Sequence, residues 1–402
     1  MKALRFDLLQ LILLASVSSY AEDWPQFLGP NRNGVTSDAG WTWEWPKSGP
    51  KELWEAQVGT GFASVSVGDG RAYTMGSVDG METVHCFDAK TGEKLWDHSY
   101  PSKLFDLNHE GGPSVTPTLH EGKAFTLGKM GKAICFDAKS GTPLWTRDLT
   151  EGIEVESPEY GYSGSPLVVG EKVLFELGPM LALNKETGAT IWRSEDFKAG
   201  FSSPTLIRVG EKDYVATLNA FGFALFDLEN GQVVRRHPFQ AFADCNIATP
   251  LQVGDSQAFI STGYGRGCEL LDLSEGVRIL WKNKTLSNHF SNSVLWNNSI
   301  LGFDGHIAKD RVPLKCLDPA TGRLLWEETR VTRGSLLVAD GKSIVLTEKG
   351  ELVVAEADRS GFQELARAQV QTGKCWIMPV LANGLLYCRN AQGRLVCLDL
   401  RA

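Results

Sequence analysis

Residues 86–96 read Cys-Phe-Asp-Ala-Lys-Thr-Gly-Glu-Lys-Leu-Trp, and variants of this phrase recur along the chain. Close copies start at Cys135, Leu183 and Cys316, and each runs through Asp or Asn and then Gly to a Trp. The Asp position or its equivalent returns at intervals of 38 to 49 residues, at positions 88, 137, 184, 227, 272, 318, 356 and 399. Self-similarity at this period indicates one supersecondary unit that is repeated around a shared core.

Each repeat contains four short runs of alternating apolar and polar residues. In the second repeat these runs are 114–119, 123–128, 133–137 and 143–147, and Gly, Asp or Asn separates them at hairpin spacing. Such runs are typical of antiparallel strands joined by tight turns. No segment shows the period of an amphipathic helix. The pattern therefore predicts an all-β fold, an eight-bladed β-propeller of four-stranded antiparallel blades.

The two ends of the chain complement each other. The last repeat stops after its third strand, at 398–400, whereas 52–56 read as a lone fourth strand that carries the expected Trp54. We expect these strands to pair, because pairing covers two sheet edges that would otherwise be exposed. The predicted ring is thus closed by its N- and C-terminal strands.

The first residues have the features of a secretory signal peptide, which we place at 1–21. A basic start leads into an apolar run at 8–17, too short to span a bilayer as a helix, and small residues precede the expected cleavage after Ala21. No cysteine follows that site to carry a lipid anchor, so we expect a periplasmic or secreted protein. The rest of the chain divides into an N-terminal extension at 22–50 and the propeller at 51–402.

Charge and cysteine content narrow the possible partners and bonds. The net charge of −8 argues against a nucleic-acid partner, which requires a basic stripe. Four of the eight cysteines share one slot of the repeat and are interpreted as small buried hydrophobic residues, and no spacing is typical of zinc. A two-residue turn at 392–393 would place Cys388 opposite Cys397, which makes this pair the one candidate disulfide.

The recurring phrase resembles the Ala-x-Asp-x-x-x-Gly-x-x-x-Trp docking motif of the PQQ-like, or quinoprotein-type, β-propellers. In that motif the Asp-to-Gly segment forms the turn between the third and fourth strands, and the Trp wedges between blades. The opening residues 23–34 also resemble the start of a group of secreted bacterial PQQ-like proteins, most of unassigned function. The motif is best preserved at Asp88, Gly92, Trp96, Asp137, Gly141, Trp145, Asn184, Gly188, Trp192, Asp318, Gly322 and Trp326.

The resemblance implies one of two functional classes. One class comprises PQQ-dependent dehydrogenases, which typically carry adjacent cysteines over the cofactor and a set of calcium-binding carboxylates; the other comprises non-catalytic scaffolds similar to BamB. This chain has no adjacent cysteines and no haem-attachment motif. We therefore expect an exported, non-catalytic binding or scaffold protein without a cofactor, whose partner is an envelope protein or an extracellular ligand. An oxidoreductase that uses PQQ with calcium is the alternative, and a carbohydrate-active propeller is a third possibility.

The loops that precede the innermost strands converge on one mouth of the central channel. Their mixed aromatic and charged residues suit a binding surface, although ordinary solvated loops would look similar. Histidine has an unperturbed pKa near neutrality, so His109 and His289 could serve as an acid or a base, and their alternative role is to satisfy backbone groups in the loops. The candidate rim residues are His109, Glu110, Glu156, Glu159, Tyr160, Tyr162, Asp244, Asn246, His289, Arg333, Lys374 and Trp376.

Overall fold

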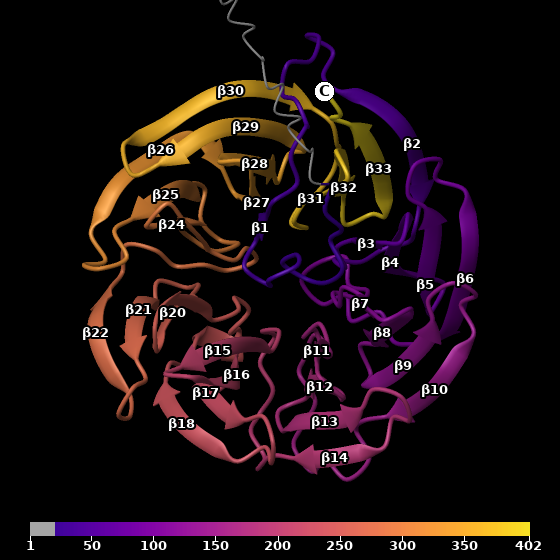
Figure 1. The fold of residues 1–402 in the computed structure, drawn as a ribbon, viewed down its shortest axis with the longest axis vertical. Coiled ribbons are helices and arrows are strands. Elements are labelled where there is room, and N and C mark those ends of the chain that lie inside the picture. Colours follow the sequence, from indigo (N-terminus) through magenta and orange to yellow (C-terminus); the bar gives the residue numbers. More distant parts are fainter. Residues whose placement is uncertain (1–20) are drawn as a thin grey trace, which may run out of the picture.

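A computed structural model describes residues 21–402, so the signal-peptide prediction lies outside the described residues apart from Ala21. Within this part of the chain, the strands form eight sheets arranged in a ring, and only one short 3-10 helix, Phe242–Asp244, interrupts them (Figure 1). The predicted all-β, eight-bladed propeller is confirmed. None of the described residues form a helix long and apolar enough to cross a membrane.

Each blade is an antiparallel meander whose strands follow one another from the channel to the outer surface. Blades 1 to 4 contain β3 (Ser66–Gly68), β4 (Arg71–Val78), β5 (Met81–Asp88), β6 (Lys94–Pro101); β7 (Thr118–His120), β8 (Lys123–Leu127), β9 (Lys132–Asp137), β10 (Pro143–Asp148); β11 (Leu167–Val169), β12 (Lys172–Glu176), β13 (Met180–Asn184), β14 (Thr190–Arg193); β15 (Thr205–Val209), β16 (Lys212–Leu218), β17 (Gly222–Asp227) and β18 (Val233–Pro238). Blades 5 to 8 contain β19 (Leu251–Gly254), β20 (Gln257–Thr262), β21 (Gly267–Asp272), β22 (Arg278–Asn283); β23 (Val294–Trp296), β24 (Ser299–Phe303), β25 (Pro313–Leu317), β26 (Leu324–Thr332); β27 (Gly334–Ala339), β28 (Lys342–Thr347), β29 (Glu351–Asp358), β30 (Gly361–Gln369); β31 (Val380–Ala382), β32 (Leu385–Arg389), β33 (Arg394–Asp399) and β2 (Lys51–Gln57).

Blade 8 joins the two ends of the chain. Strand β2, from the N-terminal side, pairs antiparallel with the C-terminal strand β33 and places Trp54 opposite Cys397 (Figure 1). The predicted closure is therefore confirmed. The joint to blade 1 is also held from inside, because the fully buried guanidinium of Arg389 donates hydrogen bonds to the carbonyls of Ala63 and Met75.

At six of the eight joints between blades, the repeated Trp links one blade to the next. The indole of Trp54 donates a hydrogen bond of 3.1 Å to the carbonyl of Ala89 in blade 1 and covers Gly92, which has a φ of 73°. A side chain at Gly92 would meet that indole, because a Cβ atom there would lie 2.6 Å from it. The same indole-to-carbonyl bond is made by Trp96, Trp145, Trp192, Trp281 and Trp326.

The turn before each of these glycines is held by the motif's Asp or Asn. Asp88 accepts hydrogen bonds from the backbone amides of Lys90 and Thr91, which lowers the pKa of its carboxyl. Asn184 makes the equivalent bonds with its amide oxygen, so the turn does not require a charge. The same turn geometry recurs at Asp137 and Asp318.

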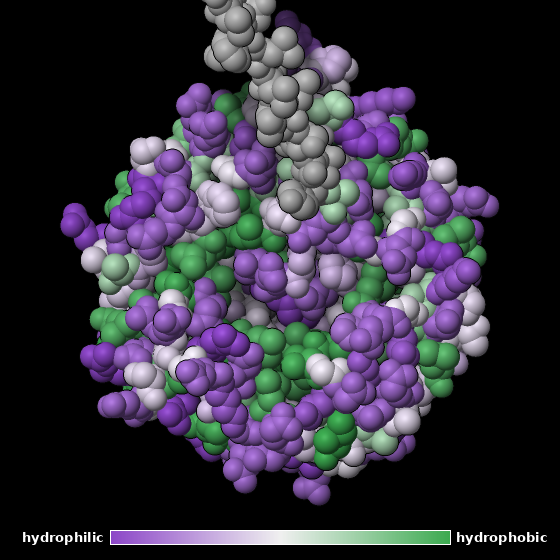
Figure 2. Space-filling model, viewed as in Figure 1, coloured by the Kyte–Doolittle hydropathy of each residue, from purple (hydrophilic) through white to green (hydrophobic). Residues whose placement is uncertain are grey.

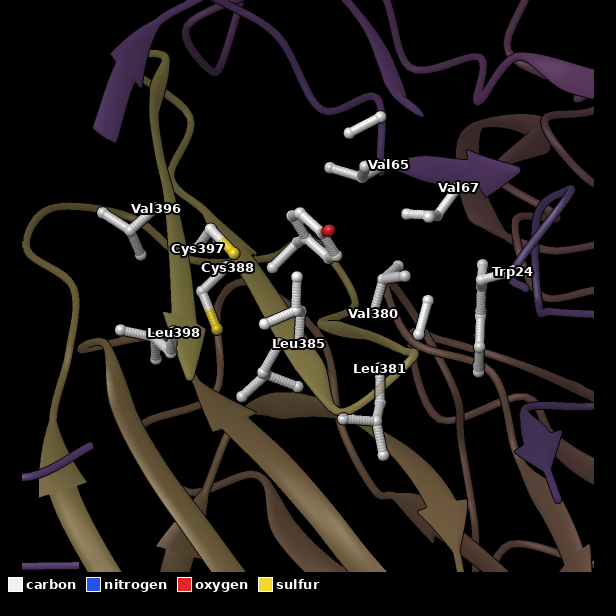
Figure 3. Packing of buried hydrophobic residues seen from close by; sticks show 14 of the residues in the cluster. Trp24, Val65, Val67, Val380, Leu381, Leu385, Cys388, Val396, Cys397 and Leu398 are labelled. Atoms are coloured by element: carbon white, nitrogen blue, oxygen red, sulfur yellow. The ribbon is translucent and has the colours of Figure 1, made fainter. Parts of the chain in front are cut away.

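The disulfide prediction is wrong, because the register of the last hairpin differs by one residue. The structure pairs Cys388 with Val396 and Cys397 with Tyr387, so the two cysteines point to opposite faces of the sheet (Figure 3). The loop contains three residues and ends at Gly393, whose φ of 96° gives a glycine bulge in place of a two-residue turn. Both thiols are buried and free.

The N-terminal extension crosses the middle of the ring (indigo in Figure 1). Trp24, fully buried, pairs with Val67 in the middle of β3, and β1 (Val35–Thr36) lies parallel to β27. Figure 3 shows Trp24 beside the apolar side chains of blade 8. Figure 2 shows the face on which the extension lies, with hydrophilic residues over the centre of the ring. The extension is thus part of the folded core and covers one end of the channel.

Candidate functional site

The central channel is a blind cup. At one end, the extension bonds to the far ends of the innermost strands, where Pro25 accepts a hydrogen bond from Leu119, and Phe27 contributes to the floor of a cavity of about 430 Å³. The loops that precede the innermost strands surround the other, open end. This volume lies in the range of small-molecule sites, about 300–1,000 Å³. We refer to this cavity as the central cup.

Aromatic side chains from these loops, together with Tyr264 from the turn between β20 and β21, line the mouth of the cup as a continuous series of ring contacts. Trp376 stacks on Phe290 with ring centroids 3.9 Å apart and on Phe62 at 5.6 Å. His109 continues the series from Phe62 to Tyr160. Aromatic pairs at such distances stabilise one another and present a large rigid surface. The aromatic collar consists of Phe201, Tyr160, His109, Phe62, Trp376, Phe290, His289 and Tyr264.

Below the collar, hydroxyl groups line the wall and bridge neighbouring blades. Thr116 Oγ1 accepts the backbone amide of Ser64, and Ser165 Oγ accepts that of Thr116. Ser203 Oγ accepts the amide of Ser165 and extends the series to blade 4. These bonds satisfy buried backbone donors near the channel axis and make this part of the wall polar.

One cation lies in this wall. The ammonium group of Lys129, in the turn between β8 and β9, donates hydrogen bonds of 3.0 Å to Ser114 Oγ and Ser163 Oγ. The residue is 2% exposed, and burial lowers the pKa of Lys129 to about 8. Among the described residues that line the cup, Lys129 is the only Lys or Arg, and none is Asp or Glu.

The two collar histidines are uncharged near neutral pH. Burial lowers the pKa of His109 to about 4, helped by the charge of Lys129, and Nδ1 of His109 accepts the backbone amide of Gly111. Burial also lowers the pKa of His289 to about 3, and both of its ring nitrogens are buried without a hydrogen-bond partner. Buried polar atoms without partners are rare and mark places where a ligand can supply the bond.

The structure brings four of the predicted rim residues together at the cup. These are His109, Tyr160, His289 and Trp376. Glu110 and Lys374 lie beside them and form an ion pair with Nζ and Oε2 2.9 Å apart.

The other predicted rim residues do not line the cup. Asn246 is fully buried and donates to the carbonyls of Asn219 and Phe239, while the Tyr162 ring is packed in the core. Asp244 pairs with Lys198. The remaining three are Arg333, which donates to the carbonyl of Ile307, and the exposed Glu156 and Glu159.

Sequence reasoning found four of the eight collar residues and missed Lys129 and the rest of the collar. A usable signal existed for the aromatics, since Phe62 and Phe201 each precede a cup serine by two residues, in equivalent slots of their repeats. No pattern in the sequence distinguished Lys129 from an ordinary exposed lysine, because a lysine in a hairpin turn is usually solvated.

A family model described as the outer membrane protein assembly factor BamB matches residues 80–312. The chain belongs to this BamB-like family of PQQ-type propellers. BamB of Burkholderia pseudomallei is 24% identical over 365 residues, which is 85% of this chain and 86% of that protein.

Solved structures of both functional classes share the fold. BamB of Moraxella catarrhalis superposes with a TM-score of 0.64 at 16% identity and covers 87% of this chain and 99% of its own. The quinohemoprotein alcohol dehydrogenase of Comamonas testosteroni gives a TM-score of 0.72 at 14% identity, with 96% and 82% covered. At these identities the likeness concerns the fold alone.

The cup residues do not fit a quinone held by calcium. Calcium takes carboxylate and carbonyl oxygens as ligands, and no carboxylate lines the cup in the part of the chain that the structure describes. The described residues also contain no group of three or more His, Cys, Asp or Glu side chains that could hold a metal ion.

Proposed function

We propose that this chain is an exported, non-catalytic binding protein that holds its ligand or partner at the open mouth of the propeller channel. The observation that carries the proposal is the aromatic collar above a blind cup. The collar histidines have pKa values far below neutral, so neither is suited to exchange protons near pH 7. Binding, rather than acid–base chemistry, is therefore what the geometry supports best.

A protein partner on the mouth face fits the distribution of exposed apolar residues. The turns between second and third strands lie at the same end of the blades as the collar loops, and these turns and loops expose Val78, Leu107, Met130, Phe221, Phe242 and Ile307. The most exposed is Phe242, at 71%. Exposed apolar groups of this kind often mark interaction surfaces. The similarity to an outer membrane protein assembly factor supports a partner in the cell envelope.

Site-specific photocrosslinking tests this proposal. A photoreactive amino acid at Phe242 or Leu107 should capture a defined partner in the envelope of the producing cell. The matched positions Lys90 and Lys139 are exposed in turns between third and fourth strands, on the opposite face, and should capture none.

The collar supplies the second arm of the experiment. Phe290→Ala should reduce capture at Phe242 while far-UV circular dichroism and the melting temperature show that the ring is intact. Equal capture from both faces, or capture that is indifferent to the collar, would contradict a binding mouth.

A further inference from the structure

The central cup contains a buried lysine, Lys129, whose ammonium group contacts no carboxylate of the described residues. Nζ of Lys129 has two serine hydroxyls as hydrogen-bond partners, and no Asp or Glu oxygen of the described residues lies within 4.0 Å of it. Glu82 accepts the backbone amide of Lys129, and its charge raises the pKa of the lysine by less than burial lowers it. An ammonium group has three N–H donors, so one remains for a ligand in the cup.

The electrostatic cost of this arrangement points to an anion. A charge that is taken out of water is destabilised unless an opposite charge or several hydrogen bonds compensate it. The cup offers Lys129 only neutral oxygens, while its lining contains no carboxylate that would repel a bound anion. A negatively charged group of a ligand, bound beside Ser114 and Ser163, would compensate the positive charge of Lys129.

The other residues that line the cup indicate the chemistry of the uncharged part of the ligand. Apolar and aromatic side chains, including Phe27 in the floor and Phe290 and Trp376 at the mouth, provide flat apolar surface. His289 adds one neutral donor and one neutral acceptor that have no partner within the protein. These features suit a flat apolar group with a few polar atoms.

We propose that the central cup binds a carboxylate attached to an aromatic or apolar body, with the carboxylate at Lys129 and the body within the aromatic collar. This inference rests on the proposed binding function and names the chemistry of the bound group. Two sources share that chemistry: a free aromatic acid, and the C-terminal carboxylate of a chain that ends in an aromatic residue.

Calorimetric titration of the mature protein with 2-naphthylacetate and its uncharged amide tests the proposal. Because a charge-assisted hydrogen bond is stronger than a neutral one, the acid should bind about tenfold more tightly than the amide or better. Lys129→Met should abolish this preference and leave amide binding unchanged. The control Lys90→Met removes an exposed lysine on the opposite face and should leave both affinities unchanged.

A second variant covers the case in which Lys129→Met does not fold. Ser163→Asp places a carboxylate beside Nζ, since the serine oxygen lies 3.0 Å from it. This variant should lower the affinity for the acid at least about tenfold and spare the amide.

A peptide arm separates the two sources. Acetyl-Gly-Gly-Phe with a free C-terminus should bind at least as tightly as acetyl-Phe if the natural ligand is a chain terminus. Weaker binding of the longer peptide would assign the cup to a free acid.

The outcomes distinguish this inference from the proposed function. Equal affinity for acid and amide, or a preference that survives both substitutions, would overturn the carboxylate assignment and leave a neutral binding cup. Absence of binding by every probe would overturn the carboxylate assignment too, while the crosslinking experiment would still decide whether the mouth binds a protein.

Discussion

The indole of Trp96 in blade 1 lies directly over Gly141 in blade 2, and a Cβ atom at Gly141 would sit 2.4 Å from the indole ring. The same indole donates to the carbonyl of Ala138, three residues before that glycine. Each such pair fixes both the spacing and the angle between adjacent blades. The repeated motif is therefore a docking joint between blades.

Replacing this glycine should weaken the joint. Gly141→Ala introduces a Cβ both at a φ of 73° and into the Trp96 ring, so we expect a loss of about 2–4 kcal/mol in the free energy of unfolding. Gly122→Ala, at a φ of 72° with open space around it, is the control and should cost only about 1–2 kcal/mol. Urea titration measures both, and equal losses would contradict the docking explanation.

Ring closure should be essential for cooperative folding. Deleting residues 51–58 removes β2 and with it Trp54, which exposes the edge of β33 and opens blade 8. We expect the single unfolding transition to be lost, as followed by circular dichroism and calorimetry. A deletion variant that melts as sharply as the parent, at the same temperature, would show that closure through β2 is dispensable.

A buried carboxyl should make stability depend on pH. Burial raises the pKa of Glu176 to about 8, although the amide of Gly178 bonds to it. Since the folded pKa exceeds the unfolded one, the native state holds the proton more tightly, and stability falls as pH rises from about 5 to about 8. Glu176→Gln should therefore gain stability relative to the parent across this window and level off above it. A stability difference that does not vary with pH would contradict the raised pKa.

The buried cysteines should remain thiols in the native protein. All eight are free and buried, and burial raises the pKa of Cys135 and of Cys397 to about 12, which suppresses the reactive thiolate. Iodoacetamide should leave the native protein unmodified and alkylate eight sites after unfolding without reductant. A peptide that joins Cys388 to Cys397 in unreduced digests would contradict the observed register.

Quinone binding should be weak. The cup has no carboxylate for calcium, so titration with PQQ, followed by absorbance, should give no saturation at micromolar concentration with or without calcium. Dye-linked assays with alcohols and sugars should show no turnover. Saturable binding with turnover that is lost in His109→Ala would favour the oxidoreductase alternative.

The repeat determined most of what could be predicted. The period of the repeat indicated the number of blades. The strand that carries Trp54 stands apart from any complete repeat, and this indicated that it closes the ring with the C-terminal strand. The Cys388 register was missed because Gly393 permits either a two-residue turn or a bulged three-residue loop, and the difference is one residue. The composition of the rim loops indicated a binding surface, but it did not indicate which side chains of these loops would line the central cup.

The cup itself could not be read from the sequence because it depends on contacts between distant segments. Arg32 reaches across the channel to the carbonyls of Ser165 and Pro166, and this anchors the extension that supplies Phe27 to the floor. Lys129 becomes a buried cation only because Ser114 and Ser163 converge on it from other loops. Local patterns carry no information on such convergence.

In the part of the chain that the structure describes, the extension lies across one end of the ring, and the channel opens between the collar loops at the other end. Whatever occupies the space above Phe27 must arrive and depart past Phe290 and Trp376. A protein bound to the mouth face would then block the entry and exit of any small molecule in the cup. A small-molecule ligand would have to enter the cup before that protein binds. The order of assembly, and not affinity alone, would decide which complexes form.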